Sequence, residues 1–237
     1  EGNIRSYDTN NPWNIIAEND FIAGGFLWTG TDYIGEAGWP SHGWPAGLFD
    51  ICMVEKPRAA FHRAMWNDEP MVRIAVRDNA LDIDHGRDLW QWPNMGAIWN
   101  FPRAYEGLVI EVNTTTNCER VALFHNGNEM GVRRTADYPN HTITWCLPYR
   151  RGTLVAKGIN GTDTVAVHEI RTAGDAVRLK TTADRGKLMA DGQDLSYVQV
   201  ELLDKDGTLV QHADRHVKAS IKGEGRLVGF ISSDLRR

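Results

Sequence analysis

The first 70 residues place one short apolar run directly before a long polar segment. Residues 21–28 are apolar and end in Trp28, and residues 29–47 are polar and rich in glycine, tryptophan and proline. This pattern is typical of a buried parallel strand whose carboxyl end continues into a functional loop. The segment is therefore the first candidate for a site.

Two helices are predicted around this strand and loop. Residues 14–19 follow a proline that suits the first turn of a helix. Residues 58–66 are good helix formers with Pro57 at their start. Their apolar positions share one face: Ala60, Phe61, Ala64 and Met65. The order helix, strand, loop, helix suggests a βα unit, which cannot alone cover both faces of a parallel strand.

From about Met71 the pattern changes to short β-rich runs separated by turn residues. Asn126-Gly127 is a strong hairpin signal, and Asn160-Gly161 marks another turn. The runs that predict strands are residues 109–113, 121–124, 142–146, 152–157 and 164–171. Regular short strands of this kind indicate a β-sandwich of roughly immunoglobulin size.

A second β-rich segment begins near Ala176. Its runs predict four strands, over residues 176–181, 195–203, 217–222 and 227–231. A sandwich normally has about seven strands, so this domain is expected to be incomplete. The predicted organisation has three parts: residues 1–70, 71–173 and 174–237.

Composition and charge narrow the functional classes. The 237 residues carry a formal net charge of −5 and no basic, aromatic-rich stretch, so nucleic-acid binding is not expected. No apolar run approaches the roughly 20 residues that span a bilayer, so no membrane partner is expected. The chain lacks a phosphate loop, a dinucleotide fingerprint and a GxSxG motif, and no cofactor is predicted.

The sulfur and imidazole side chains predict no metal site. The three cysteines are Cys52, Cys118 and Cys146. Their odd number and the lack of a CxxC pair argue against a zinc site and a disulfide framework. Cys118 and Cys146 are interpreted as buried thiols, with a bridge between them as the alternative. The irregular spacing of His42, His62 and His85 gives no ligand set.

Tryptophan is concentrated in the first part of the chain. Eight of the nine tryptophans lie before residue 100. Their rings stack on sugars, but they also fill cores and interfaces. For the cluster Trp90, Trp92 and Trp99, packing at a domain junction and a sugar-binding platform are both open.

Several segments resemble one known family, in the right order along the chain. Residues 26–36 (FLWTGTDYIGE) are similar to the eighth-strand motif of glycoside hydrolase family 2, in its β-galactosidase-like branch. Residues 47–50 (GLFD) and 55–57 (EKP) resemble the family's final loop and helix. Further resemblances to its C-terminal sandwich domains lie in residues 121–131, 198–207 and 223–229.

The resemblance implies a mainly β fold. Residues 1–70 would be the remnant of a TIM (β/α)8 barrel, with its last strand, loop and helix. Residues 71–173 would form an immunoglobulin-like β-sandwich, and residues 174–237 part of a second one.

The resemblance also implies a retaining enzyme that acts on β-galactosides or related β-glycosides. Retention needs two carboxyl groups about 5–5.5 Å apart. In the family these glutamates end the fourth and seventh barrel strands, which precede the segment seen here. The catalytic glutamates are therefore expected upstream, no catalytic residue is assigned within the chain, and the chain alone is expected to be inactive.

A carbohydrate subsite is predicted on the loop after Trp28. By resemblance Trp28 would stack on a sugar ring, Asp32 would accept hydrogen bonds from sugar hydroxyls, and Tyr33, Glu36 and Trp39 would complete the set. Each has a structural alternative, such as a core tryptophan, a loop-capping aspartate or an ion-paired glutamate. Asp32 and Glu36 are not expected to be the catalytic pair, because nothing in the sequence would separate their pKa values.

Two other functional classes stay open. Tryptophan density on β-rich scaffolds fits a carbohydrate-binding module, and sandwich domains fit a structural module that mediates assembly. Residues 1–66 favour the enzyme fragment, since a self-sufficient binding module has no use for part of a barrel. The exposed faces of such a remnant would favour self-association. Family relatives are often exported, but the compartment, the sugar and the linkage are not predicted.

Overall fold

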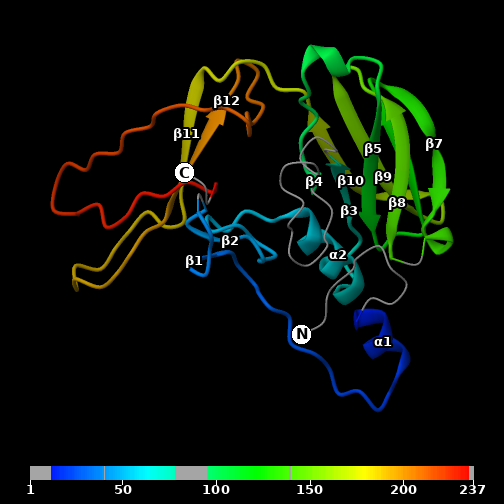
Figure 1. Ribbon diagram of the computed structural model, residues 1–237, viewed down its shortest axis with the longest axis horizontal. Helices are drawn as coiled ribbons and strands as arrows, with labels where there is room; N and C mark the ends of the chain where they lie inside the picture. The colour runs from blue at the N-terminus through cyan, green and yellow to red at the C-terminus, as the bar shows by residue number, and fades with distance from the viewer. Residues whose placement is uncertain (1–11, 40, 78–94, 139, 235–237) are drawn as a thin grey trace. The chain divides into compact units, whose positions relative to one another are not determined.

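The computed structural model describes residues 12–39, 41–77, 95–138 and 140–234. The chain divides into two compact units, the first comprising Glu1–Arg171 with Ser232–Arg237 and the second Thr172–Ile231. Within the described residues the structure is mainly β, with several separate sheets (Figure 1). None of the helices among those residues is long and apolar enough to cross a membrane.

Both predicted helices are confirmed in the first unit. α1 spans Pro12–Glu18 and α2 spans Pro57–Trp66. Pro57 occupies the first turn of α2, where its missing N–H leaves no hydrogen bond unmade. The face of α2 that bears Ala60, Phe61 and Ala64 is buried.

The strand predicted over residues 21–28 is wrong. That segment is irregular, and Phe21 is 85% exposed. A buried parallel strand needs neighbours for its backbone groups and for both of its faces, and none pairs with this segment in the described part of the chain. The loop that follows contains a small ribbon that the sequence pattern does not predict, in which β1 (Tyr33–Ile34) pairs antiparallel with β2 (Gly43–Trp44).

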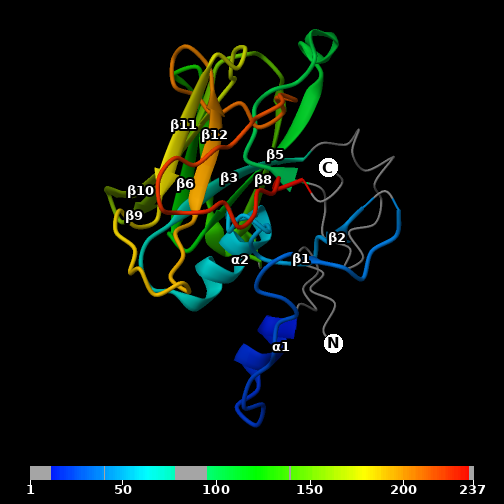
Figure 2. The same ribbon diagram turned by 90° about the vertical axis from the view of Figure 1, so that its left-hand side faces the viewer.

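Two four-stranded sheets share one hydrophobic core in the first unit (Figure 2). One sheet has the order β4-β3-β5-β8, with β3 Val72–Arg77, β4 Met95–Gly96, β5 Val109–Thr116 and β8 Thr142–Pro148. The other has the order β10-β9-β6-β7, with β6 Arg120–His125, β7 Asn128–Arg134, β9 Thr153–Asn160 and β10 Asp163–Arg171. Short 3-10 turns cover Arg103–Tyr105 and Thr135–Asp137.

The hairpin predicted at Asn126-Gly127 is confirmed between β6 and β7. Both residues have positive φ, 50° and 82°, as a two-residue hairpin turn with the favoured twist requires. The Asn126 side chain also reaches the next connection, where its Oδ1 accepts the Thr153 N–H at 2.7 Å and its Nδ2 donates to the Arg151 carbonyl at 3.0 Å.

The bridge considered between Cys118 and Cys146 is wrong, and all three cysteines are free. Cys118 is buried in the turn after β5, as expected for a structural thiol. The buried-thiol interpretation is wrong for Cys146, which is exposed on β8 opposite Glu111, near the start of β5. Its neighbours Trp145 and Leu147 face the core, so the alternation of the strand turns Cys146 outward. The two thiols therefore lie toward opposite ends of β5.

The second unit contains one antiparallel pair, β11 (Arg178–Ala183) with β12 (Val198–Leu203). The strands predicted over residues 217–222 and 227–231 are wrong, because both segments are irregular. Their side chains are largely exposed, and no neighbouring strand takes up their backbone groups in the described residues of this unit.

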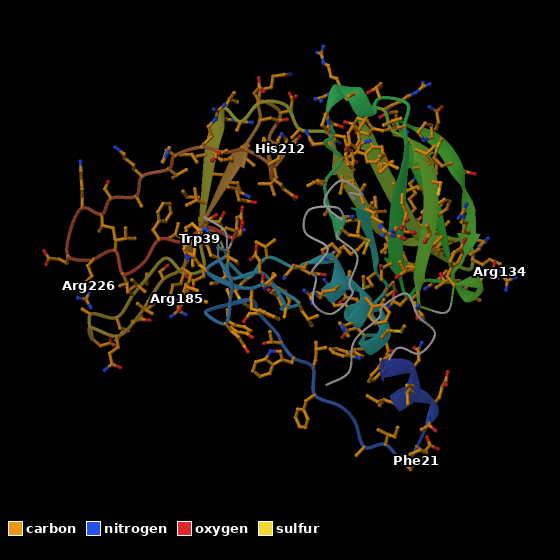
Figure 3. All side chains as sticks on the ribbon, in the orientation of Figure 1. Phe21, Trp39, Arg134, Arg185, His212 and Arg226 are labelled. Carbon is orange, nitrogen blue, oxygen red and sulfur yellow. The ribbon has the colours of Figure 1, made fainter. Side chains whose placement is uncertain are left out.

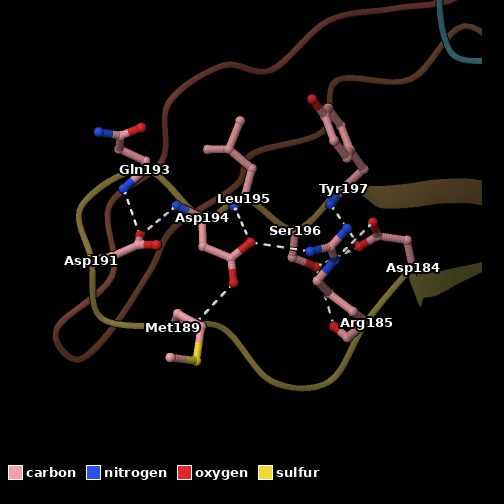
Figure 4. A network of polar contacts seen from close by, with 9 residues as sticks. All are labelled: Asp184, Arg185, Met189, Asp191, Gln193, Asp194, Leu195, Ser196 and Tyr197. Carbon is pink, nitrogen blue, oxygen red and sulfur yellow. Dashed lines mark hydrogen bonds and ion pairs between the residues drawn. The ribbon is translucent and has the colours of Figure 1, made fainter.

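Polar contacts order the long connection between β11 and β12 (Figure 4). Asp184 Oδ1 accepts the Ser196 hydroxyl and the Tyr197 N–H, each at 2.9 Å. These bonds, the Ser196 hydroxyl first, hold the pKa of the Asp184 carboxyl below its usual value. Arg185 lies 3.1 Å from Asp194 Oδ1 and crosses the base of the loop.

His168 on β10 connects the two sheets of the first unit. Its Nδ1 accepts a hydrogen bond from the Ile74 N–H of β3 at 3.0 Å, so that nitrogen carries no proton and the ring is neutral. Burial, and secondarily the nearby Arg73, lowers the pKa of His168 from 6.5 to about 4. Burial lowers the pKa of His62 on α2 to about 4 as well.

We expect the first unit to lose stability as the pH falls from 6.5 to 4. In that window the unfolded chain binds protons that the folded chain excludes, so the free energy of unfolding decreases as the pH decreases. The decrease levels off below pH 4, where the histidine is protonated in both states. One histidine contributes at most about 1.4 kcal/mol per pH unit. Urea unfolding between pH 4 and 7 measures the slope. His168→Gln should flatten it, and an unchanged slope would contradict the assignment.

Candidate functional site

The predicted site residues lie on one segment, which we call the aromatic loop (residues 28–47). It follows the irregular segment 21–28 and contains the β1–β2 ribbon. Trp28 is 63% exposed at the start of this loop, and Trp39, which is 88% exposed, lies in the segment that connects β1 to β2 (Figure 3). Exposed aromatic faces of this kind are available to a partner or a ligand.

Among the predicted residues, Tyr33 contacts both Trp28 and Glu36. The rings of Trp28 and Tyr33 meet edge to face, with centroids 6.1 Å apart. The Tyr33 hydroxyl donates to Glu36 Oε2 at 2.6 Å. This hydrogen bond is the main reason that the pKa of Tyr33 is raised above 10.0, since the carboxylate favours the protonated phenol. The result is an exposed Trp28 ring packed on a half-buried Tyr33, whose hydroxyl binds a carboxylate oxygen.

Asp32 faces the protein rather than solvent. It is 6% exposed, and its Oδ1 accepts the Gly47 N–H at 2.7 Å and the Lys56 ammonium at 2.6 Å. Its backbone N–H donates to the Phe49 carbonyl at 2.9 Å. The carboxylate thus joins the start of the aromatic loop to its end and to the residue before α2.

Trp39 forms a separate contact. Its ring packs edge to face on His42, with centroids 6.4 Å apart. It therefore lies beside the ribbon without a described ring contact to Trp28 or Tyr33. The loop presents two aromatic surfaces, one at Trp28 and Tyr33 and one at Trp39.

The local chemistry suits a neutral polyhydroxylated ligand. Exposed aromatic faces can stack on the apolar face of a sugar ring, and Glu36 can accept hydroxyl hydrogen bonds. Among the described residues, no group of three histidine, cysteine, aspartate or glutamate side chains could hold a metal ion. A cavity of about 240 Å³ lies elsewhere, is lined in part by Arg63, Glu69 and Arg73, and includes none of the predicted site residues.

Of the three tryptophans predicted to cluster at the start of the sandwich, only Trp99 lies within the described residues. Trp90 and Trp92 lie outside the described residues. Trp99 is fully buried in the sandwich core, so the sugar-platform interpretation is wrong for it. Its rings pack on Tyr149 and His125, with centroids 4.9 and 5.6 Å away.

Sequence reasoning missed the residues that hold the loop. Lys56 and Arg58, at the start of α2, both donate to the Pro45 carbonyl. Gly47 is buried so close to the Thr31–Asp32 backbone that a side chain has no room. The sequence offers only an indirect signal, because residues 47–50 and 55–57 resemble the family's final loop and helix but do not reveal these contacts.

Two family models match parts of the chain. The model described as "Glycoside hydrolase family 2 C-terminal domain 5" matches residues 179–237. A second, described as "Domain of unknown function (DUF4982)", matches residues 107–166.

Similar proteins cover most of the chain. A Bacteroides ovatus protein named "Beta-galactosidase BoGH2A" is 32% identical over 218 residues, which is 91% of this chain and 23% of that protein. A candidate β-glucuronidase of Formosa agariphila is 30% identical over 226 residues, 92% of this chain and 20% of that protein. The crystal structure of a glycosyl hydrolase family 2 member from Bacteroides cellulosilyticus matches with a TM-score of 0.77 at 32% identity, over 90% of this chain and 29% of that one. The chain therefore spans less than a third of the length of these relatives.

Proposed function

Since this chain is the C-terminal part of a glycoside hydrolase family 2 protein, we propose that the whole protein hydrolyses a β-glycoside with retention of configuration. Its substrates would be β-galactosides or related β-glycosides such as β-glucuronides. The observation that carries the proposal is the match of nine-tenths of the chain to family 2 proteins named for these activities. The catalytic glutamates would lie upstream of this chain.

The proposed domain organisation explains the exposed apolar side chains near the start. Residues 1–70 would be the end of a TIM barrel, residues 71–173 an immunoglobulin-like sandwich, and residues 174–237 part of a second one. Phe21 and Phe26 are fully or nearly fully exposed here. In the proposed barrel, upstream strands and helices would cover these side chains. In the isolated chain the same surface would favour self-association.

We further propose that the aromatic loop contributes to the sugar subsite. Trp28 would stack on the sugar ring, with Tyr33 holding Glu36 as a hydrogen-bond acceptor and Trp39 lining the approach. The supporting observation is the contact of Trp28 with Tyr33 and of Tyr33 with Glu36.

Activity assays on two forms of the protein test the proposal. The full-length protein should hydrolyse a chromogenic β-galactoside or β-glucuronide, and the chain of residues 1–237 should give no turnover. The reason is that a retaining site needs two carboxyl groups that this chain is not expected to contain. Turnover by the chain alone, or a full-length protein inactive on every β-glycoside tried, would contradict it.

A further inference from the structure

The aromatic loop has little buried apolar surface of its own. Besides the two exposed tryptophans, Ile34 in the ribbon is also exposed. Burial of these side chains therefore cannot hold them in position, because an exposed ring gains little from staying where it is. The order of the loop must come largely from polar contacts.

Two cations at the start of α2 supply such contacts. The Lys56 ammonium lies 2.6 Å from Asp32 Oδ1 and 3.0 Å from the Pro45 carbonyl oxygen. Arg58 donates to the same carbonyl at 2.5 Å. Asp32 lies near the start of the loop and Pro45 near its end, so a single ammonium joins both ends to the helix.

We infer that Lys56 is a positioning residue of the sugar subsite. It fixes Asp32 and Pro45 against α2, and thereby fixes the loop that carries Trp28. Asp32 in this arrangement acts through Lys56 and does not touch the sugar, because its side chain is only 5% exposed and is turned toward Lys56 and Gly47, which donate to its Oδ1. The inference rests on the proposed function.

Loss of the Lys56–Asp32 ion pair would leave a buried charge, whereas loss of a surface ion pair leaves a charge in water. Without the ammonium, the Asp32 side chain would remain buried, with 6% of the residue exposed. The backbone N–H of Gly47 would be the remaining described hydrogen-bond donor to its carboxylate. An unpaired buried charge is strongly unfavourable, so the loop should open until water reaches the carboxylate. Neutralising both partners removes this driving force.

Kinetics of the full-length protein test the assignment. Lys56→Met should lower kcat/KM on the order of 10- to 100-fold, mainly through KM, because a misplaced loop weakens sugar binding. Lys56→Arg should recover most of the loss, since a guanidinium can serve both acceptors. Lys56→Met combined with Asp32→Asn should be no worse than Lys56→Met alone. The matched control is Lys180→Met, which removes an exposed Lys–Glu pair at 2.8 Å in the second unit and should change nothing.

Limited proteolysis, mapped by mass spectrometry, measures how well ordered the aromatic loop is, without any substrate. Lys56→Met should be cut faster within residues 30–46, while Lys56→Arg and Lys180→Met should be cut like the parent. If the parent protein turns over no β-glycoside, the proposed function fails, and the cleavage pattern alone decides whether Lys56 holds the loop. Unchanged KM and unchanged cleavage in Lys56→Met, or no recovery with Lys56→Arg, would overturn the inference.

Discussion

Replacing Gly47 with alanine is expected to open the aromatic loop. A Cβ at this position would lie 2.2 Å from both the Asp32 nitrogen and the Thr31 carbonyl carbon, and 2.6 Å from the Phe49 oxygen. These are backbone atoms, so no side-chain rotation relieves the overlap, and the two passing segments must separate. The separation would break the Gly47–Asp32 hydrogen bond.

The expected cost of Gly47→Ala is at the upper end of the roughly 1–3 kcal/mol typical of overpacking. Hydrogen exchange should show lost protection over residues 29–56, and kcat/KM of the full-length protein should fall. Gly38→Ala is the matched control, because a Cβ there meets no atom within 4 Å and the loop is the same. Equal behaviour of the two variants would mean that Thr31 and Gly47 do not approach as described.

The elements that could be predicted from the sequence are those that local residues determine. The α2 helix follows from Pro57 and from an apolar face that recurs every three to four residues. The β6–β7 hairpin follows from Asn126-Gly127, whose positive φ angles few other dipeptides adopt without strain. Neither depends on chain far away in the sequence.

The elements that failed depend on partners. The apolar run 21–28 has the composition of a strand, but a strand forms only where a neighbour accepts its hydrogen bonds. The same reason applies to residues 217–222 and 227–231. The hydrophobic pattern of a segment shows which side chains it can bury. It does not show whether another segment is there to pair with it and cover it.

The site shows the same division between local and distant contacts. The sequence singled out Tyr33 and Glu36, which are three residues apart, and the two side chains do meet. The two interpretations of Asp32 could not be separated, because its partner Lys56 is 24 residues away and the distance emerges only from the fold.

Replacing Trp99 with alanine is expected to have the largest effect on stability. Trp99 is fully buried among residues of both sheets, and its Nε1 donates to the Arg150 carbonyl at 2.9 Å. Truncation would leave a cavity in the shared core and remove one of the two hydrogen bonds to the Arg150 carbonyl, the other coming from His125 Nε2 at 3.0 Å. Large aromatic truncations of this kind cost about 3–5 kcal/mol, a large fraction of a domain's stability.

Thermal unfolding of the chain measures this effect against a matched truncation. Trp39→Ala removes the same atoms from an exposed position and should leave the melting temperature nearly unchanged. Trp99→Phe should be intermediate, because the ring refills part of the space but cannot donate to Arg150. If Trp99→Ala melts like Trp39→Ala, Trp99 does not fill the sandwich core. The sugar-platform interpretation would then return, and polysaccharide binding by the Trp99 variants would decide it.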